Sequence, residues 1–457
     1  MRHIGWKWLA VSSLLIGALA ATAETRPQYG GTLHVTTRAA FTSLDPADSR
    51  QPDSFARRGI SSLLFDTLVT IDDSGRVQPL LAESWQLGHG NQKRQFRIRH
   101  GVKFQDGSTL TAEAVASSLR AANPAWVLIV EADSVIIEAD RPDAQLLAEL
   151  ALARNAIVKR DADSKVNGTG PFHIVDWQPG RKLILAADED HWSGRPFLDG
   201  IEIEMGKSFR DQSTAMEIGR AELVEIAPEQ AHRLSQSGRG LMTSAPTELL
   251  ALMFVREASS PEEKNLREAL GLSIERGSIR NVLLQGAGQP AASLLPTWMS
   301  GYGFTFKSDA DLPKARQLRD QVRSVPTWTI GYDSSDPLAR LIAERVALNA
   351  RDAGLSLQPS SSANGDLRLV RIPLSSTDPW VALAELDSQF GLQAPKIKGS
   401  SIEDLYATEQ AALATERLIP LFHLPASYAS APGLRNWTLR PAGSWDLSAA
   451  WLEGARP

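Results

Sequence analysis

The stretch LLAESWQLGHGNQKRQFRIRHGVKFQDGSTLTAEAVASSL, residues 80–119, says the most about the fold. Its β-rich segments around residues 84–86 and 95–99 predict two short strands, and the polar GHGN run breaks the chain between them. Asp106-Gly107 then predicts a tight turn. Thr111 is placed to cap the helix that follows it. The stretch therefore predicts two strands, a turn and a helix start, and it contains no catalytic pattern.

Length and composition are those of a globular protein with more than one core. The chain has 457 residues, of which 43% are hydrophobic and 22% charged, which excludes a disordered or fibrous chain. Its net charge of −5 argues against a nucleic-acid surface. The absence of cysteine excludes disulfides, thiolate metal sites, cysteine nucleophiles and a lipidated cysteine.

The N-terminal residues 1–23 have the pattern of an export signal. Arg2 and Lys7 make a basic start, residues 8–20 are apolar, and Ala21-Thr22-Ala23 offers the small residues that signal peptidase requires. The alternative, a retained membrane anchor, is weaker because the apolar run falls short of the roughly 20 residues that span a bilayer. We therefore expect a protein that is released, without a lipid anchor, into the periplasm.

The rest of the chain alternates strand and helix patterns. Residues 30–36 predict a first strand, and the apolar runs 249–255 and 418–424 predict buried strands. Ser260-Pro261-Glu262-Glu263 predicts a helix start with a capping box. Residues 327–358 predict a strand, a helix and a second strand, which is the pattern of an α/β unit.

Several of these motifs together resemble the family 5 extracellular solute-binding proteins, the peptide-, dipeptide- and nickel-binding receptors of ABC importers. The resemblance is carried by AESW at 82–85, by RHGVKFQDGSTLTAEAVASSL at 99–119, by NGTGPF at 167–172 and by NLREALGLSIERGSI at 265–279. It implies a mixed α/β, two-lobe periplasmic-binding-protein fold of type II, in the large family 5 subtype, with ligand bound between the lobes.

The resemblance also implies a division of the chain. Lobe one would comprise residues 24–245, with an extra subdomain over about 46–170, and lobe two residues 246–416. The tail, 417–457, would return to lobe one. Only about forty residues separate Asp378 from the strand at 418–424, which is fewer than family members usually have, so lobe two is expected to be shortened.

Asp378 is the main candidate for a ligand contact. It lies in RIPLSSTDPW, residues 371–380, directly after a β-rich run. In peptide-binding members of the family, the loop after the equivalent strand holds an acid that pairs with the ligand's α-ammonium. Such a charge-assisted bond is roughly twice as strong as a neutral one. The alternative is that Asp378 and Pro379 start a turn or cap the next helix.

Five further residues complete the predicted contact set: Ser376, Trp380, Arg38, Phe41 and Thr42. Trp380 would supply an aromatic platform, with ordinary packing as the alternative. Arg38 lies in the first cleft loop, as the resemblance implies, and would meet a ligand carboxylate. Its alternative is a solvated surface arginine.

The motif search predicts a binding protein and not an enzyme. The chain has no G-x-S-x-G, H-E-x-x-H or Walker pattern, and its eight histidines are scattered, so no cofactor or metal site is expected. The resemblance implies a monomer that captures short peptides by hinge closure and delivers them to a membrane permease. Two alternatives stay open: a scaffold or sensor with a degenerate second lobe, and a receptor for another solute such as a nickel chelate.

Overall fold

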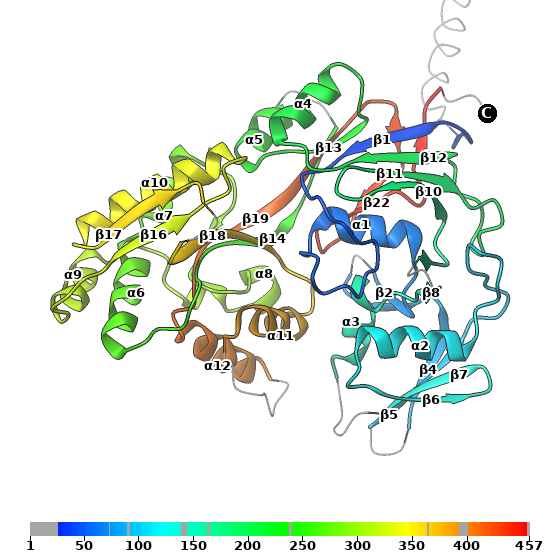
Figure 1. Cartoon of the computed structure of the whole chain (residues 1–457), viewed down its shortest axis with the longest axis horizontal. Helices are drawn as coiled ribbons and strands as arrows, with labels where there is room; N and C mark the ends of the chain where they lie inside the picture. The colour runs from blue at the N-terminus through cyan, green and yellow to red at the C-terminus, as the bar shows by residue number, and fades with distance from the viewer. Residues whose placement is uncertain are drawn as a thin grey trace, which may run out of the picture.

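The computed structural model describes most of the chain between residues 26 and 454. The described ranges are 26–72, 74–88, 92–138, 144–161, 165–236, 240–362, 365–392 and 401–454. The predicted export signal, residues 1–23, lies outside them. Figure 1 shows two α/β halves that share one large sheet, with a smaller sheet below the half that contains β1.

The described residues form an 11-stranded mixed sheet that runs through both halves. Its order is β10-β11-β12-β1-β13-β19-β14-β18-β16-β17, and β15 pairs with β19. We call the part with β1 and β10–β13 the first half and the part with β16–β18 the second half. The strands are β1 (Thr32–Thr36), β10 (Phe172–Gln178), β11 (Lys182–Ala187), β12 (Gly200–Glu204), β13 (Leu223–Glu225), β14 (Gly240–Phe254), β15 (Gln289–Pro290), β16 (Thr327–Gly331), β17 (Ser356–Ser360), β18 (Leu367–Pro373) and β19 (Leu418–Ser430).

Strands β14 and β19 carry the sheet from one half to the other (Figure 1). The C-terminal end of β19 pairs with β13 and with the start of β14, whereas the later part of β14 lies between β19 and β18. The register between β14 and β19 shifts around Pro246, where the chain passes from one half to the other. Residues 249–254 and 418–424 lie in these two strands, which confirms the predicted buried strands, whereas Val255 follows the end of β14 and is exposed. Their near-continuous burial follows from their central position in the sheet.

The first half packs helices and the C-terminal tail against the sheet. Its helices are α1 (Phe55–Leu64), α4 (Phe209–Glu217) and α5 (Pro228–Gln236). The tail contributes short strands: β20 (Leu434–Arg435), β21 (Thr438–Leu439), β22 (Trp445–Asp446) and β23 (Trp451–Leu452). Trp445 is fully buried against α1, so closely that a Cβ on Gly59 would lie 2.7 Å from its ring. Trp437 and Trp451 are buried as well, so the tail tryptophans pack inside the protein.

The smaller sheet forms a separate layer with its own core. Its order is β4-β5-β7-β6, and α2 covers it (Figure 1). Its elements and neighbours are β2 (Val69–Ile71), β3 (Val77–Pro79), β4 (Ala82–Leu87), β5 (Lys93–Ile98), α2 (Ala112–Ala122), β6 (Val127–Glu131), β7 (Ser134–Glu138), α3 (Leu146–Leu150), η2 (Ala153–Asn155), β8 (Lys159–Arg160) and β9 (Val166–Asn167). The two strands, the turn and the helix start predicted within residues 80–119 are confirmed. Thr111 Oγ1 accepts a hydrogen bond from Ala114 N at 3.2 Å.

The second half contains the predicted strand–helix–strand unit, β16–α10–β17, whose two strands pair in parallel. Its helices are α6 (Pro261–Ser273), α7 (Arg276–Val282), α8 (Thr297–Ser300), η3 (Gly303–Thr305), α9 (Leu312–Asp320), α10 (Pro337–Asp352), α11 (Pro379–Phe390) and α12 (Ile402–Leu413). The predicted cap of α6 forms, since Ser260 Oγ accepts from Glu263 N. The capping box is half formed, because the Glu263 carboxylate binds Ser259 and Arg267 instead of the Ser260 amide.

The division predicted for the two lobes can be placed on this architecture. Its boundary at residues 245 and 246 lies inside β14, beside the shift in register, and the boundary at 416 and 417 directly precedes β19. These boundaries stay predictions. No helix in the described ranges combines the length and the apolar character that a membrane span needs.

Candidate functional site

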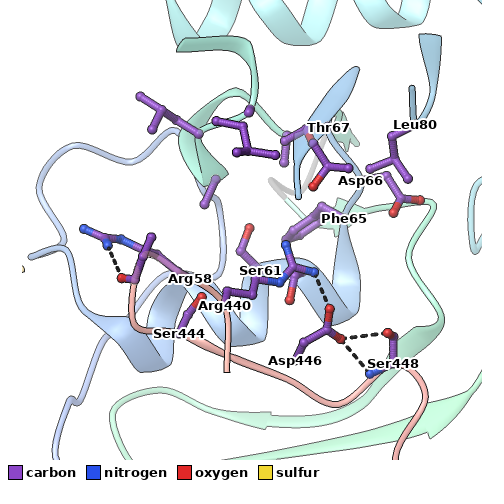
Figure 2. A pocket seen from close by; sticks show the side chains of 18 of the residues that line it. Arg58, Ser61, Phe65, Asp66, Thr67, Leu80, Arg440, Ser444, Asp446 and Ser448 are labelled. Atoms are coloured by element: carbon purple, nitrogen blue, oxygen red, sulfur yellow. Dashed lines mark hydrogen bonds and ion pairs between the residues drawn. The ribbon is translucent and has the colours of Figure 1, made fainter. Parts of the chain in front are cut away.

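Three neighbouring cavities lie where the first half faces the second. The one we call the Asp66 cavity has a volume of about 440 Å³. From the first half it is lined by the loop after α1, by the corner at residues 191–193 and by tail residues 438–448. From the second half it is lined by residues 375–377, which connect β18 to α11. Figure 2 shows the α1 and tail side chains that border it.

The other two cavities adjoin it. The larger cavity, of about 770 Å³, lies between the loop at residues 46–53 and the β18–α11 segment, and it shares Arg58, Ser61 and Ser375 with the Asp66 cavity. The Asp378 cavity, again of about 440 Å³, is lined from the second half by Trp298 and residues 377–379, and otherwise mainly by residues within 71–77 and 144–148, beside the smaller sheet. The three spaces thus surround the β18–α11 connection, as subsites of one cleft would.

Contacts between the halves border this cleft. Arg58 of α1 donates to the carbonyl oxygens of Leu374 at 2.7 Å and Pro373 at 3.1 Å. Arg154 forms an ion pair with Glu385 of α11. Each contact joins a side chain on one side of the cleft to the β18–α11 region, so the two sides touch at its border.

Asp378 caps α11 in this structure. Its Oδ1 accepts from Trp380 N at 2.9 Å and from Val381 N at 3.1 Å, while its own amide donates to Ser376 Oγ at 3.0 Å. The helix-cap alternative is therefore what the geometry shows. Because the carboxylate also lines a cavity, its pairing with a ligand ammonium stays a prediction.

Arg38 forms contacts between the two halves, at a place outside the three cavities. Its guanidinium lies 3.5 Å from Asp336 and 3.6 Å from Asp333 of the second half, and it stands over the Phe209 ring. Its amide donates to Glu225 at 2.6 Å. Burial raises the pKa of Glu225, and the hydrogen bond from Arg38 acts in the opposite direction. The arginine thus stabilises the junction, and it lines none of the three cavities.

The other predicted residues are dispersed around the cleft. Ser376 lines the Asp66 cavity and Phe41 the larger one, although Phe41 is buried and stacks on Trp177. Thr42 N donates to the Gln51 side chain, and Trp380 packs against an apolar cluster of the second half. The structure therefore brings Ser376 and Asp378 together and places Phe41 at the larger cavity, whereas Thr42 and Trp380 line none of the three cavities.

The main residue that the sequence predictions left out is Asp66. Its Oδ2 accepts from Thr169 Oγ1 at 2.9 Å and from Trp192 Nε1 at 3.1 Å. Burial raises the pKa of its carboxyl, and those two hydrogen bonds oppose the effect. A signal was present: Asp66 is the one acid in the otherwise apolar run around LLFDTLV. An ionisable residue in such a run is a candidate site residue, because its burial needs a reason.

The cleft also contains a paired arginine and carboxylate. Arg440 Nη2 donates to Asp446 at 2.8 Å, and Asp446 accepts further from Ser448 (Figure 2). Burial acts to raise the pKa of Asp446, but Arg440 and Ser448 outweigh it and lower the pKa. Within the described part of the chain, no group of three histidine or acidic side chains is arranged to hold a metal ion.

Two curated proteins are similar to this chain in sequence. A 26% identical alignment over 279 residues links the chain to the nickel-binding protein NikA of Staphylococcus aureus, covering 58% of this chain and 55% of that protein. A 24% identical alignment links it to the probable D,D-dipeptide-binding periplasmic protein DdpA of Escherichia coli, covering 64% and 62%. The aligned part thus spans less than two thirds of either relative.

The similarity to solved structures covers more of this chain than the sequence alignments do, and a family model also matches it. The periplasmic binding protein DppA of Helicobacter pylori, in complex with the peptide STSA, superposes with a TM-score of 0.79 at 18% identity. That match covers 93% of this chain and 99% of the other, so the periplasmic-binding-protein fold is confirmed. Residues 76–371 match the model of the bacterial extracellular solute-binding proteins, family 5. The match spans more than half of the sequence, and the chain belongs to this family.

Proposed function

We propose that this protein is the periplasmic solute-binding component of an ABC importer and that it captures short peptides between its two halves. Closure about the β14–β19 crossing would bury the peptide, and the closed form would be presented to a membrane permease. The observation that carries the proposal is the cleft itself. Both halves contribute residues to the walls of the cavities. The contacts of Arg58 with Leu374 and of Arg154 with Glu385 join the two sides at the border of the cleft.

The lining of the cleft suits a peptide. Ser61, Ser375, Ser376 and Thr377 offer hydroxyl groups, and Asp66 offers a carboxylate, so main-chain amides and an ammonium could be satisfied. The names of DdpA and of the DppA structure mention a dipeptide and a peptide, which supports the same ligand class. Among the described lining residues of the three cavities, His191 is the only imidazole, which gives a nickel chelate less support.

The same lining speaks against the scaffold alternative. A degenerate binding lobe would be expected to fill the cleft with apolar side chains, whereas these cavities stay open and have serine, threonine, arginine and aspartate side chains among their lining residues. The tail tryptophans that a scaffold could have offered to a partner are buried. We therefore propose a protein that binds its ligand in this cleft. We further propose that it acts as a monomer and that the signal pattern of residues 1–23 directs its export.

Native mass spectrometry of the protein purified from the periplasm tests this proposal. Released ligands are identified after denaturation, and emptied protein is then offered a library of di- to pentapeptides. We expect a set of short-peptide masses that disappears on denaturation and returns with the library. A protein that arrives empty and binds no member of the library would contradict the proposal. Fractionation of the same cells, with sequencing of the mature N-terminus, tests export.

A further inference from the structure

Buried polar atoms without a protein partner converge on the Asp66 cavity. Within the described residues, four such atoms belong to side chains that line it: Ser61 Oγ, His191 Nε2, Ser375 Oγ and Arg440 Nε. A buried polar atom that makes no hydrogen bond costs about 1–3 kcal/mol. Four such side chains around one space give its wall a polar character, with three atoms that can accept and one, Arg440 Nε, that can only donate.

The hydrogen bond of His191 Nδ1 decides whether Nε2 of the same ring is a donor or an acceptor. His191 Nδ1 lies 3.1 Å from the carbonyl oxygen of Gly194, which can only accept. In the neutral ring the proton therefore sits on Nδ1, and Nε2 presents a lone pair. The seryl hydroxyls can accept as well. The cavity thus offers several acceptors to a ligand that donates N–H groups.

One carboxylate that lines the cavity lacks a direct ion pair in the described part of the chain, although the charges of Arg440 and His191 act from a distance to lower the pKa of this Asp66 carboxyl. Arg58 is paired with Asp53, and Arg440 is paired with Asp446. Asp66 makes no ion pair with any described residue, and both of its hydrogen bonds reach the same oxygen, Oδ2. Neither of these hydrogen bonds uses Oδ1, and the residue lines the cavity (Figure 2). A cation bound there would pair directly with this carboxylate.

Asp66 is also held in place. Thr169 and Trp192 orient the carboxylate, and Thr169 lies between two glycines that pack against the end of α1. A Cβ on Gly168 would lie 1.8 Å from the Leu64 carbonyl oxygen, so only glycine permits this approach. A carboxylate that is fixed before the ligand arrives loses little conformational entropy on binding.

Part of the wall of the Asp66 cavity is apolar. Phe65, Ile71, Leu80 and Leu152 line the same cavity. An aliphatic stem could pack against them while its charged end reaches Asp66, as long basic side chains do elsewhere. The Asp66 cavity also shares Ile71 and Thr377 with the Asp378 cavity, so one ligand could occupy both.

We propose that the Asp66 cavity is a subsite for a basic side chain of the bound peptide. The ammonium or guanidinium of a lysine or arginine pairs with Asp66 Oδ1, beside the His191 ring that lines the same cavity. This inference rests on the proposed capture of peptides. It names the preferred class of that ligand as short peptides with a cationic side chain, distinct from the α-ammonium predicted for Asp378.

Isothermal titration calorimetry with matched peptides tests the subsite. Trialanine is compared with tripeptides that carry lysine, norleucine or glutamate at each position in turn, because norleucine keeps the stem and lacks the charge. We expect wild type to prefer the best lysine peptide over its norleucine match by about 10- to 150-fold, the range for a hydrogen bond to a charged group. The Asp66→Asn variant should bind both peptides with nearly equal affinity.

A matched variant and a fold control complete the experiment. Asp176→Asn removes a carboxylate of β10 that accepts only from Gln178 and lines none of the three cavities, so it should keep the wild-type preference. Circular dichroism and thermal unfolding check that each variant is folded. Asp66→Glu, which keeps the charge, should retain part of the preference if Asp66→Asn loses it.

The outcomes separate this inference from the function on which it rests. If no peptide binds to wild type, the proposed function fails and the subsite with it. If peptides bind but lysine and norleucine are equivalent, only the subsite is refuted. If Asp66→Asn weakens trialanine as much as the lysine peptides, Asp66 binds the peptide main chain or its α-ammonium, and the subsite is again refuted. Loss of the preference in Asp176→Asn would refute a local pairing.

Discussion

Replacing Asp378 by asparagine would separate the two roles considered for this residue. In the structure, Oδ1 of Asp378 accepts from two amides at the start of α11, at 2.9 and 3.1 Å. Asparagine presents an oxygen with the same reach, and the two residues are nearly equivalent as N-caps. The free energy of unfolding of Asp378→Asn should therefore stay within about 0.5 kcal/mol of wild type.

Ligand affinity should respond very differently if the carboxylate also pairs with the α-ammonium of a peptide. Removing one partner of a buried charge pair costs about 2–5 kcal/mol, which corresponds to a loss of about 30- to 4,000-fold in affinity. Asp378→Ala should lose the same affinity and, in addition, about 1 kcal/mol of stability, because alanine cannot cap the helix. Calorimetric titration with a tripeptide and urea unfolding followed by tryptophan fluorescence measure the two quantities.

A chemical control makes the assignment sharper. Acetylating the peptide's N-terminus removes the ammonium, so it should weaken binding to wild type and have little further effect on Asp378→Asn. If Asp378→Asn binds the free peptide as wild type does, or if acetylation costs the same in both proteins, the carboxylate serves α11 alone. The ammonium would then have to be recognised elsewhere in the cleft.

Three further changes have expected outcomes. Gly168→Ala places a Cβ 1.8 Å from the Leu64 carbonyl oxygen and should cost about 3 kcal/mol of stability in urea unfolding, at the upper end of the range for overpacking; a loss below about 1 kcal/mol would contradict the packing. Burial lowers the pKa of His423 from 6.5 to about 4, so its contribution to stability is complete above pH 6.5 and declines as the pH falls to about 4. Wild type should lose about 3 kcal/mol more than His423→Gln over that window, and parallel pH profiles would refute this. Glu385→Gln breaks the ion pair with Arg154 across the cleft and should speed peptide release by up to about fivefold in stopped flow, an effect that salt should reduce; equal rates at low salt would refute a role in closure.

Local elements of this fold could be read from neighbouring residues. The cap at Thr111 and the β16–α10–β17 unit depend on contacts within a few residues or on one helix face, and both form as the sequence predicts. The start of α6 shows the limit. Ser260 caps the helix as expected, but the Glu263 carboxylate binds Arg267, a residue whose burial depends on the surrounding core.

The candidate site was less predictable because its residues come from distant parts of the chain. Arg38 follows the first strand, yet its partners Asp333 and Asp336 lie almost 300 positions away, so no sequence window could show that the arginine is already paired. Asp378 could be recognised as a helix cap or as a ligand contact, and only the cavity beside it keeps both roles open.

By itself, the sequence determined the family motifs, the mixed α/β class and the main helix caps, because each is encoded by residues close together along the chain. The tertiary structure decided which charges meet. It brings the loop after α1, the corner at 191–193 and the C-terminal tail around one cavity, and it leaves Asp66 there without a direct ion pair to any described residue. Whether a carboxylate is paired depends on packing between segments separated by hundreds of residues, and no local pattern specifies that.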